Sequence, residues 1–204
     1  TDIVALDLSA PDAADKLWKT VKDRPVDVLI NNAGFGALAP LVNADWKKLR
    51  AMIDLHITAL TRLSQLAAQT MSARKSGKIL NVASIAGFLP GPGMGVYYAT
   101  KAYVLSLSEA MSEELKASGV TVTALCPGPT KTHFSEAAGA DKTRLFSGNL
   151  PTAQEVAEYG YKSLRTGKVV AVHGIGNKLN ALVLPRLMTR KFVRKTINRV
   201  QNAT

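Results

Sequence analysis

The feature that most constrains the fold is a regular alternation of short apolar runs with longer segments of helical periodicity. The runs are short enough for strands, and most are apolar at consecutive positions, as in strands buried on both faces. They cover residues 3–6, 26–30, 78–83, 120–125 and 169–172. Short buried strands separated by helices are typical of a parallel sheet covered on both sides. The sequence therefore predicts an α/β fold, a doubly wound parallel sheet in three α/β/α layers.

Helix signals fill the intervals between these runs. Pro11 and Asp12 indicate a helix start, and Asn43 is a suitable N-cap for the segment that follows it. Apolar residues at helical spacing predict long helices over about residues 44–70, 97–117 and 152–164.

Polar and small residues follow the predicted strands. Doubly wound sheets bind ligands beyond the carboxyl ends of their strands. A functional site is therefore expected around the residues that come directly after strands, which are Asp7, residues 31–34, Ser84 and Pro127 with its successors.

Tyr97 and Lys101 are four residues apart at the start of a predicted helix, so their side chains share one face. A nearby cation favours tyrosinate, lowers the phenol pKa and makes the tyrosine a general acid or base. Ser84 could donate a hydrogen bond to a substrate carbonyl. Each residue alone also fits a purely structural role, and Tyr98, three residues before Lys101, could reach the same face.

The stretch GKILNVASIAGFLPGPGMGVYYATKAYV (residues 77–104) resembles the short-chain dehydrogenase/reductase family, with Ser thirteen residues before Tyr and Lys four after it. The resemblance implies a Rossmann-like fold and an NAD(P)-dependent oxidoreductase acting on a carbonyl or secondary alcohol. The family pattern selects Tyr97 over Tyr98. It implies that Ser84 orients the carbonyl, that Tyr97 moves the proton, and that Lys101 also holds the nicotinamide ribose.

Further segments match family motifs that contact the cofactor. Asp7 corresponds to the acid that accepts a hydrogen bond from adenine. Residues 31–34 correspond to the NNAG motif beneath the cofactor, and residues 127–132 to the segment that contacts the nicotinamide carboxamide. The resemblance thus implies an NAD or NADP site, with NADP favoured, whose contacts are Asp7, Asn32, Ala33, Gly34, Tyr97, Lys101, Pro127, Gly128, Thr130 and Thr132.

His56 departs from the family pattern. The family usually has Asn at this place in the MIDLHIT stretch, where it holds a water in the proton path behind the lysine. Imidazole ordinarily titrates near neutral pH, so His56 is either a catalytic relay residue or a helix residue without catalytic weight. His133 and His173 have no partners at metal-ligand spacing, and no metal site is expected.

The amino-terminal motifs of the family are missing. Family members begin with a strand, a glycine-rich turn that holds the pyrophosphate, and a second strand, but this chain opens where the third strand belongs. We therefore expect a segment of a longer protein, an incomplete dehydrogenase domain over residues 1–174 that binds dinucleotide weakly or not at all. Two absent strands would separate the strand at 3–6 from the strand at 26–30. The alternative is that the first strand is rearranged or that another chain fills the gap.

The formal charge of +11 is concentrated at the carboxyl end. Ten of the 26 Lys and Arg residues follow Glu158, the last of the acidic residues. A basic helical extension is expected over residues 175–204, and residues 182–200 are amphipathic. This segment either packs on the domain or contacts an anionic substrate or membrane surface. The alternative to an enzyme is a non-catalytic binding or regulatory protein that uses this tail. Nucleic acid is not an expected partner, because no recognisable nucleic-acid module accompanies the charge.

Several general expectations complete the prediction. Cys126 is the single cysteine, so no internal disulfide is possible and a cytoplasmic location is expected. The resemblance implies a homodimer or homotetramer that pairs through the two long helices. Residues 131–150 should line the pocket, and Phe134, Leu145 and Phe146 suggest an apolar or amphipathic small-molecule carbonyl compound as substrate.

Overall fold

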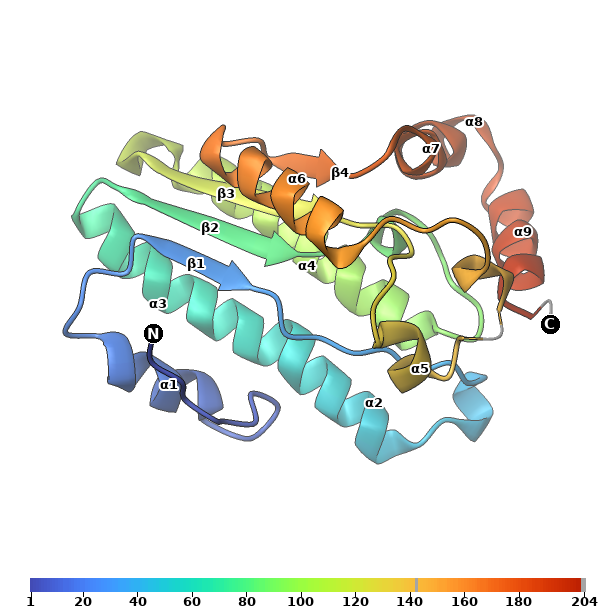
Figure 1. Ribbon diagram of the computed structural model, residues 1–204, viewed down its shortest axis with the longest axis horizontal. Helices are drawn as coiled ribbons and strands as arrows, with labels where there is room; N and C mark the ends of the chain where they lie inside the picture. The colour runs from blue at the N-terminus through green and yellow to red at the C-terminus, as the bar shows by residue number, and fades with distance from the viewer. Residues whose placement is uncertain (142, 203–204) are drawn as a thin grey trace.

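The computed structural model describes residues 1–141 and 143–202 and contains a four-stranded, entirely parallel sheet (Figure 1). The strands follow the chain order β1-β2-β3-β4 across the sheet. They are β1 (Val28–Asn31), β2 (Gly77–Val82), β3 (Val120–Cys126) and β4 (Val170–Val172). The four predicted runs after residue 20 therefore form strands, and the doubly wound fold is confirmed.

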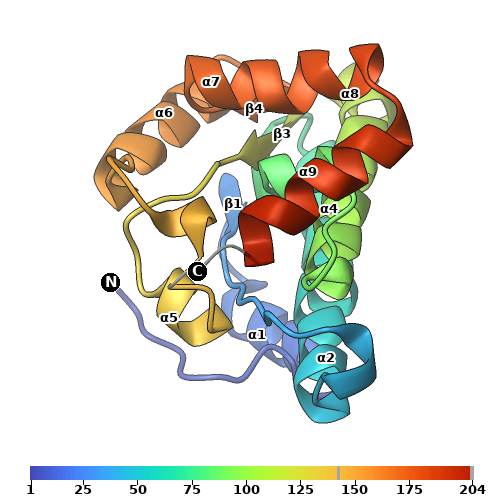
Figure 2. The ribbon, with the colours of Figure 1, turned by 90° about the vertical axis from the view of Figure 1, so that its right-hand side faces the viewer.

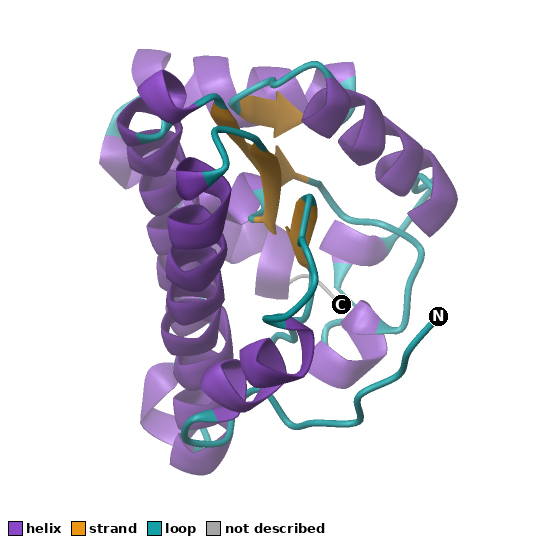
Figure 3. Ribbon diagram, turned by 90° about the vertical axis from the view of Figure 1, so that its left-hand side faces the viewer, coloured by secondary structure: helices purple, strands orange, loops and turns teal. Residues whose placement is uncertain are grey.

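Helices cover both faces of the sheet in three layers, as Figure 3 shows from the side. Helices α3 (Leu60–Ala73) and α4 (Gly95–Glu114) lie on one face, and α6 (Ala153–Arg165) lies on the other. The alternation of side chains along β2 explains this arrangement. Ile79 packs in a cluster with Met71 of α3, whereas Leu80 packs in a cluster with Leu164 of α6.

The predicted helix over 44–70 is one long rod with an irregular centre. It consists of α2 (Trp46–Ile53), a π-helical turn (Asp54–Ala59) and α3. The expected N-cap was wrong, because Asn43 ends a preceding 3₁₀ turn and Asp45 caps α2. The Asp45 carboxylate accepts a hydrogen bond from the Lys47 amide. His56 belongs to this π-helical turn and is buried, with 1% of its surface exposed.

The strand expected at residues 3–6 is absent. This segment has no strand pairing, and Ile3 is 91% exposed. A strand forms only where another strand satisfies its backbone groups, and these residues lack such a partner. The predicted spacing between a strand at 3–6 and the next strand therefore has no counterpart in the structure.

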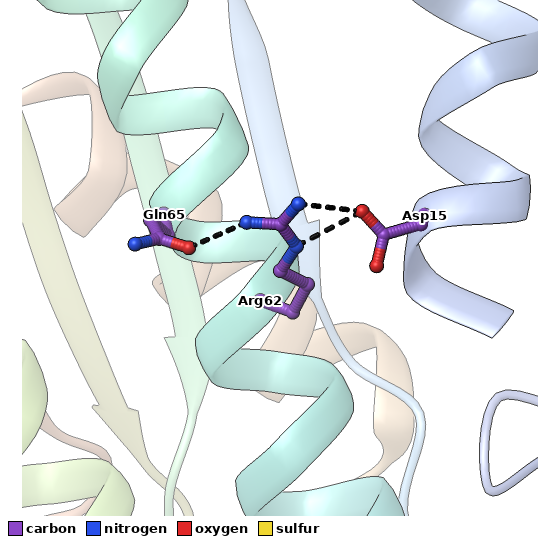
Figure 4. A network of polar contacts seen from close by, with 3 residues as sticks. All are labelled: Asp15, Arg62 and Gln65. Carbon is purple, nitrogen blue, oxygen red and sulfur yellow. Dashed lines mark hydrogen bonds and ion pairs between the residues drawn. The ribbon is translucent and has the colours of Figure 1, made fainter. Parts of the chain in front are cut away.

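Helix α1 (Ala13–Val21) follows this segment and packs on α3. Arg62 of α3 holds it through two hydrogen bonds to Asp15 Oδ1, from Nε at 3.0 Å and Nη2 at 2.6 Å, while Nη1 donates to Gln65 (Figure 4). An ion pair therefore docks the first helix of the chain onto the domain.

The remaining elements surround the carboxyl ends of the strands. They are 3₁₀ turns at Ile85–Phe88 and Arg144–Phe146, helices α5 (Phe134–Ala138), α7 (Ile175–Lys178), α8 (Leu184–Leu187) and α9 (Arg190–Asn202), and a π-helical turn at Leu179–Val183. The 3₁₀ turn at Lys116–Ser118 instead precedes β3 at the amino ends of the strands. Helix α9 crosses this edge of the sheet (Figures 1 and 2). Residues 203–204 of the predicted extension, and Lys142 of the predicted pocket segment, lie outside the described residues. None of the helices in the described part of the chain is long and apolar enough to cross a membrane.

Candidate active site

A cavity of about 840 Å³ lies at the carboxyl edge of the sheet. Most of the site residues expected from the sequence line it, because the loops after β1, β2 and β3 converge there with the start of α4. Those that line it are Asn32, Gly34, Ser84, Tyr97, Lys101, Pro127, Gly128, Thr130 and Thr132. Phe134, Leu145 and Phe146 of the predicted pocket segment line it as well.

Ser84 lies two residues beyond the end of β2 and caps the 3₁₀ turn that follows. Its Oγ accepts a hydrogen bond from the Ala86 amide at 3.1 Å and donates to the Pro127 carbonyl at 3.4 Å. The hydroxyl is therefore held between the loops after β2 and β3, at the rim of the cavity.

Lys101 is buried beneath Tyr97. Its Nζ donates a hydrogen bond of 2.7 Å to the Val82 carbonyl at the end of β2 and lies 5.8 Å from the centre of the Tyr97 ring. Burial lowers the pKa of this ammonium to about 8. The helical spacing of four residues thus places the cation under the phenol as expected, and at pH 7 it is still mostly protonated.

The expected lowering of the Tyr97 pKa by Lys101 was wrong for this structure. Burial of the phenol raises its pKa to about 12 and outweighs a hydrogen bond with Ser84, which lowers it. Desolvation favours the neutral form of a phenol, so Tyr97 carries its proton at neutral pH. Its neighbour Tyr98 is occupied elsewhere, because the Tyr98 hydroxyl accepts a hydrogen bond from Gln201 of α9 at 2.9 Å.

His56 does not line the cavity but lies directly behind it. Its Nε2 accepts a hydrogen bond from the Phe35 amide at 3.2 Å, and its Nδ1 is 3.0 Å from Thr100 Oγ1. Burial and the charge of Lys101 lower its pKa to about 3. The imidazole is therefore neutral at neutral pH, and a relay role for His56 stays a prediction.

Gly34 is required by the position of His56. A Cβ atom at residue 34 would lie 2.8 Å from His56 Nε2, closer than real Cβ contacts come. The NNAG loop can pass over the imidazole only because this residue has no side chain. The imidazole of His56 thus contacts both the NNAG loop and helix α4.

A network of side-chain hydrogen bonds holds the start of the NNAG loop. Motif matching alone does not predict this network. Asn31 Nδ2 donates to Ser64 Oγ of α3 at 3.0 Å and to Asn81 Oδ1 of β2 at 2.8 Å. Asn81 Nδ2 in turn donates to Ser108 of α4 at 2.9 Å. These bonds join two strands and two helices, so the polar residues inside the sheet fix the start of the loop.

Two expected cofactor contacts lie outside the cavity lining. Asp7 is exposed, and its carboxylate accepts hydrogen bonds from the amide and hydroxyl of Ser9, which lower its pKa. Ala33 lies in the NNAG loop between lining residues but does not itself line the described cavity. The structure therefore collects the residues expected near the nicotinamide and leaves the one expected near the adenine at the surface.

The carboxyl-terminal segment contributes a wall that motif matching did not predict. Residues of α9 and the turn before it line the cavity, and their signal in the sequence was the amphipathic pattern over 182–200. They are Met188, Phe192, Val193, Thr196, Ile197 and Val200.

The histidines outside the site have local contacts. His133 lies 3.3 Å from a Glu136 carboxylate oxygen at the surface, and the His173 ring packs against the edge of Tyr159. Within residues 1–141 and 143–202, no three His, Cys, Asp or Glu side chains are grouped so that they could hold a metal ion.

The fold is a doubly wound parallel sheet, and a cavity at the carboxyl ends of its strands is lined by Ser84, Tyr97 and Lys101. Together these features define a class of α/β proteins. The sequence profile of the family described as short chain dehydrogenase matches residues 1–143, and the chain belongs to this family.

Individual relatives agree with this assignment. The chain is 34% identical over 145 residues to a 3-oxoacyl-[acyl-carrier-protein] reductase of Synechocystis, covering 70% of this chain and 59% of that protein. It is 29% identical over 203 residues to a very-long-chain 3-oxoacyl-CoA reductase of Rattus norvegicus, covering 95% and 62%. A short-chain dehydrogenase from Sphingobium yanoikuyae, solved in complex with NADPH, superposes with a TM-score of 0.78 at 27% identity, covering 98% and 76%. The chain thus spans about 60% of the length of these two curated relatives.

Proposed function

We propose that this chain carries the catalytic part of a nicotinamide-dependent oxidoreductase that interconverts a carbonyl and a secondary alcohol. The observation that carries the proposal is the convergence of Ser84, Tyr97 and Lys101 on one cavity at the carboxyl edge of the sheet. Chemistry of this kind needs a proton donor, a hydrogen-bond donor to the carbonyl oxygen and a nearby cation. These three side chains supply one each.

The residues around the cavity fit the nicotinamide end of NAD or NADP. Lys101 and the hydroxyl groups of Thr130 and Tyr97 are suited to hydrogen bonds with a ribose and a carboxamide. Asn32 and Gly34 would lie beneath the ring. When bound, the reduced nicotinamide supplies the hydride. The bound NADPH of the Sphingobium structure supports the same cofactor class, NAD or NADP.

At neutral pH the protonation state of Tyr97 suits the role of proton donor in carbonyl reduction. The Tyr97 phenol, whose pKa is raised to about 12, keeps its proton until the carbonyl oxygen accepts it. Ser84 donates a hydrogen bond to the same oxygen as charge develops there. The Lys101 ammonium, within 5.8 Å of the ring centre, then stabilises the tyrosinate that remains.

The names of two relatives support a 3-oxoacyl thioester as the substrate. Both the Synechocystis and the rat protein are named as 3-oxoacyl reductases. An acyl chain suits the apolar side chains that line the cavity, including Phe134, Phe146 and Ile197. We therefore extend the proposal from carbonyl compounds in general to this class.

Replacing the phenol oxygen of Tyr97 tests the proposal. Tyr97→Phe in the full protein should lower kcat by on the order of 10²- to 10⁴-fold, because the proton donor is lost. Binding of the nicotinamide, followed by its fluorescence, should remain measurable. Tyr103→Phe is the matched control, because its hydroxyl lies on the same helix and contacts Thr61 at the surface. Turnover by Tyr97→Phe at the level of this control would reject the assignment.

A further inference from the structure

The helical segment after β4 exposes a stripe of aliphatic side chains. Helix α7, the π-helical turn and α8 follow one another without a break and form one rod, which runs along the top of Figure 2. The stripe consists of residues at intervals of four along this rod, each 40% to 86% exposed: Ile175, Leu179, Val183 and Leu187. A step of four residues is longer than an α-helical turn and shorter than a π-helical turn, so the drift in the α-helical parts is offset in the middle. The four side chains therefore stay on one side of the rod.

The opposite side of the rod is packed against the domain. Ala181 is buried, and Leu182 packs against the core cluster that contains Cys126 and Val172. Because its inner side is already filled, the rod cannot turn the stripe inward to bury it. Contiguous apolar surface of this kind on a folded protein marks an interaction site.

The exposed apolar surface continues to the opening of the cavity. Met188, in the turn before α9, and Phe192, in its first turn, are 38% and 53% exposed, and both also line the cavity. Since each of these side chains has one surface toward solvent and another toward the cavity, they lie at its rim. Asn180 of the rod lines the cavity as well. The stripe and the cavity opening therefore adjoin.

Exposed cations accompany this apolar surface. Residues 175–199 contain seven Lys and Arg residues, and none of them forms an ion pair with a residue that the structure describes. They are Lys178, Arg186, Arg190, Lys191, Arg194, Lys195 and Arg199. No acidic side chain follows Glu158 in the sequence to neutralise them. The outer surface of this segment is thus both apolar and positively charged.

An anionic lipid surface matches this combination better than a second copy of the chain does. Amphipathic helices with aliphatic residues and Lys or Arg lie in the plane of a bilayer, and each cation adds to the attraction of an anionic leaflet. In a symmetric dimer the same surface is used by both copies, so the unpaired cations would face one another. A second copy would also cover the cavity opening, whereas fluid acyl chains leave it open to apolar compounds.

We propose that residues 175–199 dock the protein on the surface of an anionic phospholipid bilayer. The stripe lies among the head groups and the upper acyl chains, the cations bind the lipid phosphates, and the cavity opening faces the membrane. The docking itself does not depend on the reaction that the site catalyses. Entry of an apolar carbonyl compound from the bilayer is the part that rests on the proposed function.

Sedimentation with lipid vesicles tests the docking in the full protein. We expect binding to vesicles of mixed phosphatidylglycerol and phosphatidylcholine, weaker at high salt, and binding at least about tenfold weaker to phosphatidylcholine alone. Leu179→Gln/Leu187→Gln should lower the partition coefficient by at least about tenfold, because two aliphatic side chains no longer insert. Leu41→Gln/Val42→Gln is the matched control, since it makes the same kind of change at exposed aliphatic residues outside the segment.

A second set of variants tests the charge. Lys191→Gln/Arg194→Gln/Lys195→Gln should lower binding to the anionic vesicles by on the order of 100-fold. The matched control is Lys16→Gln/Lys19→Gln/Lys22→Gln, which removes the same charge from exposed positions on α1, at the other side of the molecule in Figure 1. Equal losses in the two triple variants would show that net charge alone is responsible and would overturn the proposal.

A reporter variant keeps the test independent of lost binding. Leu187→Trp should gain fluorescence quenching by lipids brominated on their acyl chains, whereas Leu41→Trp, with the same native Trp18 and Trp46, should not. Absence of both sedimentation and quenching would overturn the proposal and leave the proposed function intact, because Tyr97-dependent turnover of a soluble ketone needs no vesicles. If Leu179→Gln/Leu187→Gln instead abolishes a concentration-dependent rise in mass and no vesicles are bound, a second copy covers the surface and the proposal is rejected.

Discussion

The buried side chain of His56 forms hydrogen bonds with two separate segments beside the cavity. Because Nε2 accepts from the Phe35 amide, the ring proton is on Nδ1 and is donated to Thr100 Oγ1. Thr100 in turn donates to the Tyr97 carbonyl at 2.8 Å. These hydrogen bonds connect the residue after the NNAG loop to the backbone of Tyr97, the proposed proton donor.

The neutrality of this histidine predicts acid sensitivity. Burial lowers the pKa of His56 in the folded chain to about 3, against an ordinary value of 6.5, so below pH 6.5 the unfolded chain binds a proton that the folded chain does not bind. Folding stability is therefore lost as the pH falls through this window. Between pH 7 and pH 4.5 the His56 contribution is about 2 to 3 kcal/mol. His56→Gln, whose amide can make both hydrogen bonds without titrating, should remove that part of the loss in urea unfolding.

His133→Gln is the matched control for this measurement, because His133 lies at the surface and its side chain is 99% exposed. Carboxylates titrate equally in all three proteins, so the comparison isolates the imidazole. If wild type and His56→Gln lose the same stability between the two pH values, the buried neutral histidine is not the cause.

The spacing of Tyr97 and Lys101 was sufficient to predict their shared face, since four residues span about one helical turn. The direction of the Tyr97 pKa shift was not predictable in the same way. It depends on burial by residues from other elements, such as Phe134 of α5, whose ring centre lies 5.4 Å from that of Tyr97. Local periodicity fixes which side chains are neighbours, and the tertiary packing fixes their solvation.

At the scale of elements, apolar periodicity located the helices better than it located their ends. It predicted a single helix from 44 to about 70, and the structure adds a π-helical turn at Asp54–Ala59. Such a turn leaves the apolar pattern nearly unchanged, so periodicity alone does not reveal it. The strand predicted at 3–6 failed for a related reason, because an apolar run becomes a strand only beside a partner.

The docking of α1 predicts local rather than global destabilisation when its ion pair is removed. Arg62→Met keeps the apolar stem but deletes both hydrogen bonds to Asp15. The two side chains are 41% and 38% exposed, so the effect should be small and should diminish with salt. We expect faster hydrogen exchange in residues 13–21, with unchanged exchange in β2 and β3.

Arg50→Met is the control for this prediction, because Arg50 pairs with Asp54 on its own helical rod and joins no second element. Equal exchange of α1 in wild type and Arg62→Met would mean that Trp18 and the buried alanines hold α1 without the ion pair.

At the scale of the whole molecule, the sequence locates the positive charge along the chain but not in space. The bond between Gln201 and Tyr98 joins residues 103 positions apart, and no local pattern predicts such a contact. Once α9 is placed across the carboxyl edge of the sheet, the tail and the motif residues become parts of one cavity. The family motifs predicted the part of this cavity expected to face the nicotinamide, and the structure supplied its opposite wall.

The open edge of the sheet predicts self-association of the 204-residue chain. Strand β1 is an outer strand of the described sheet, and its Val28 and Ile30 side chains are 44% and 53% exposed on one face. An unpaired strand edge with exposed aliphatic residues is a template for pairing with a second copy. We expect the mass measured by light scattering after size exclusion to rise with concentration. Ile30→Lys should suppress this rise, because a charge on the edge strand opposes pairing.

Val42→Lys is the matched control, because it makes the same kind of change at an aliphatic residue that is 91% exposed and outside the sheet. Equal suppression by both variants would show that added charge alone is responsible. Association that persists in Ile30→Lys would instead place the contact elsewhere, for example on the long helices expected from the sequence to form a dimer interface. The two outcomes distinguish pairing through the edge of β1 from association through another surface of the chain.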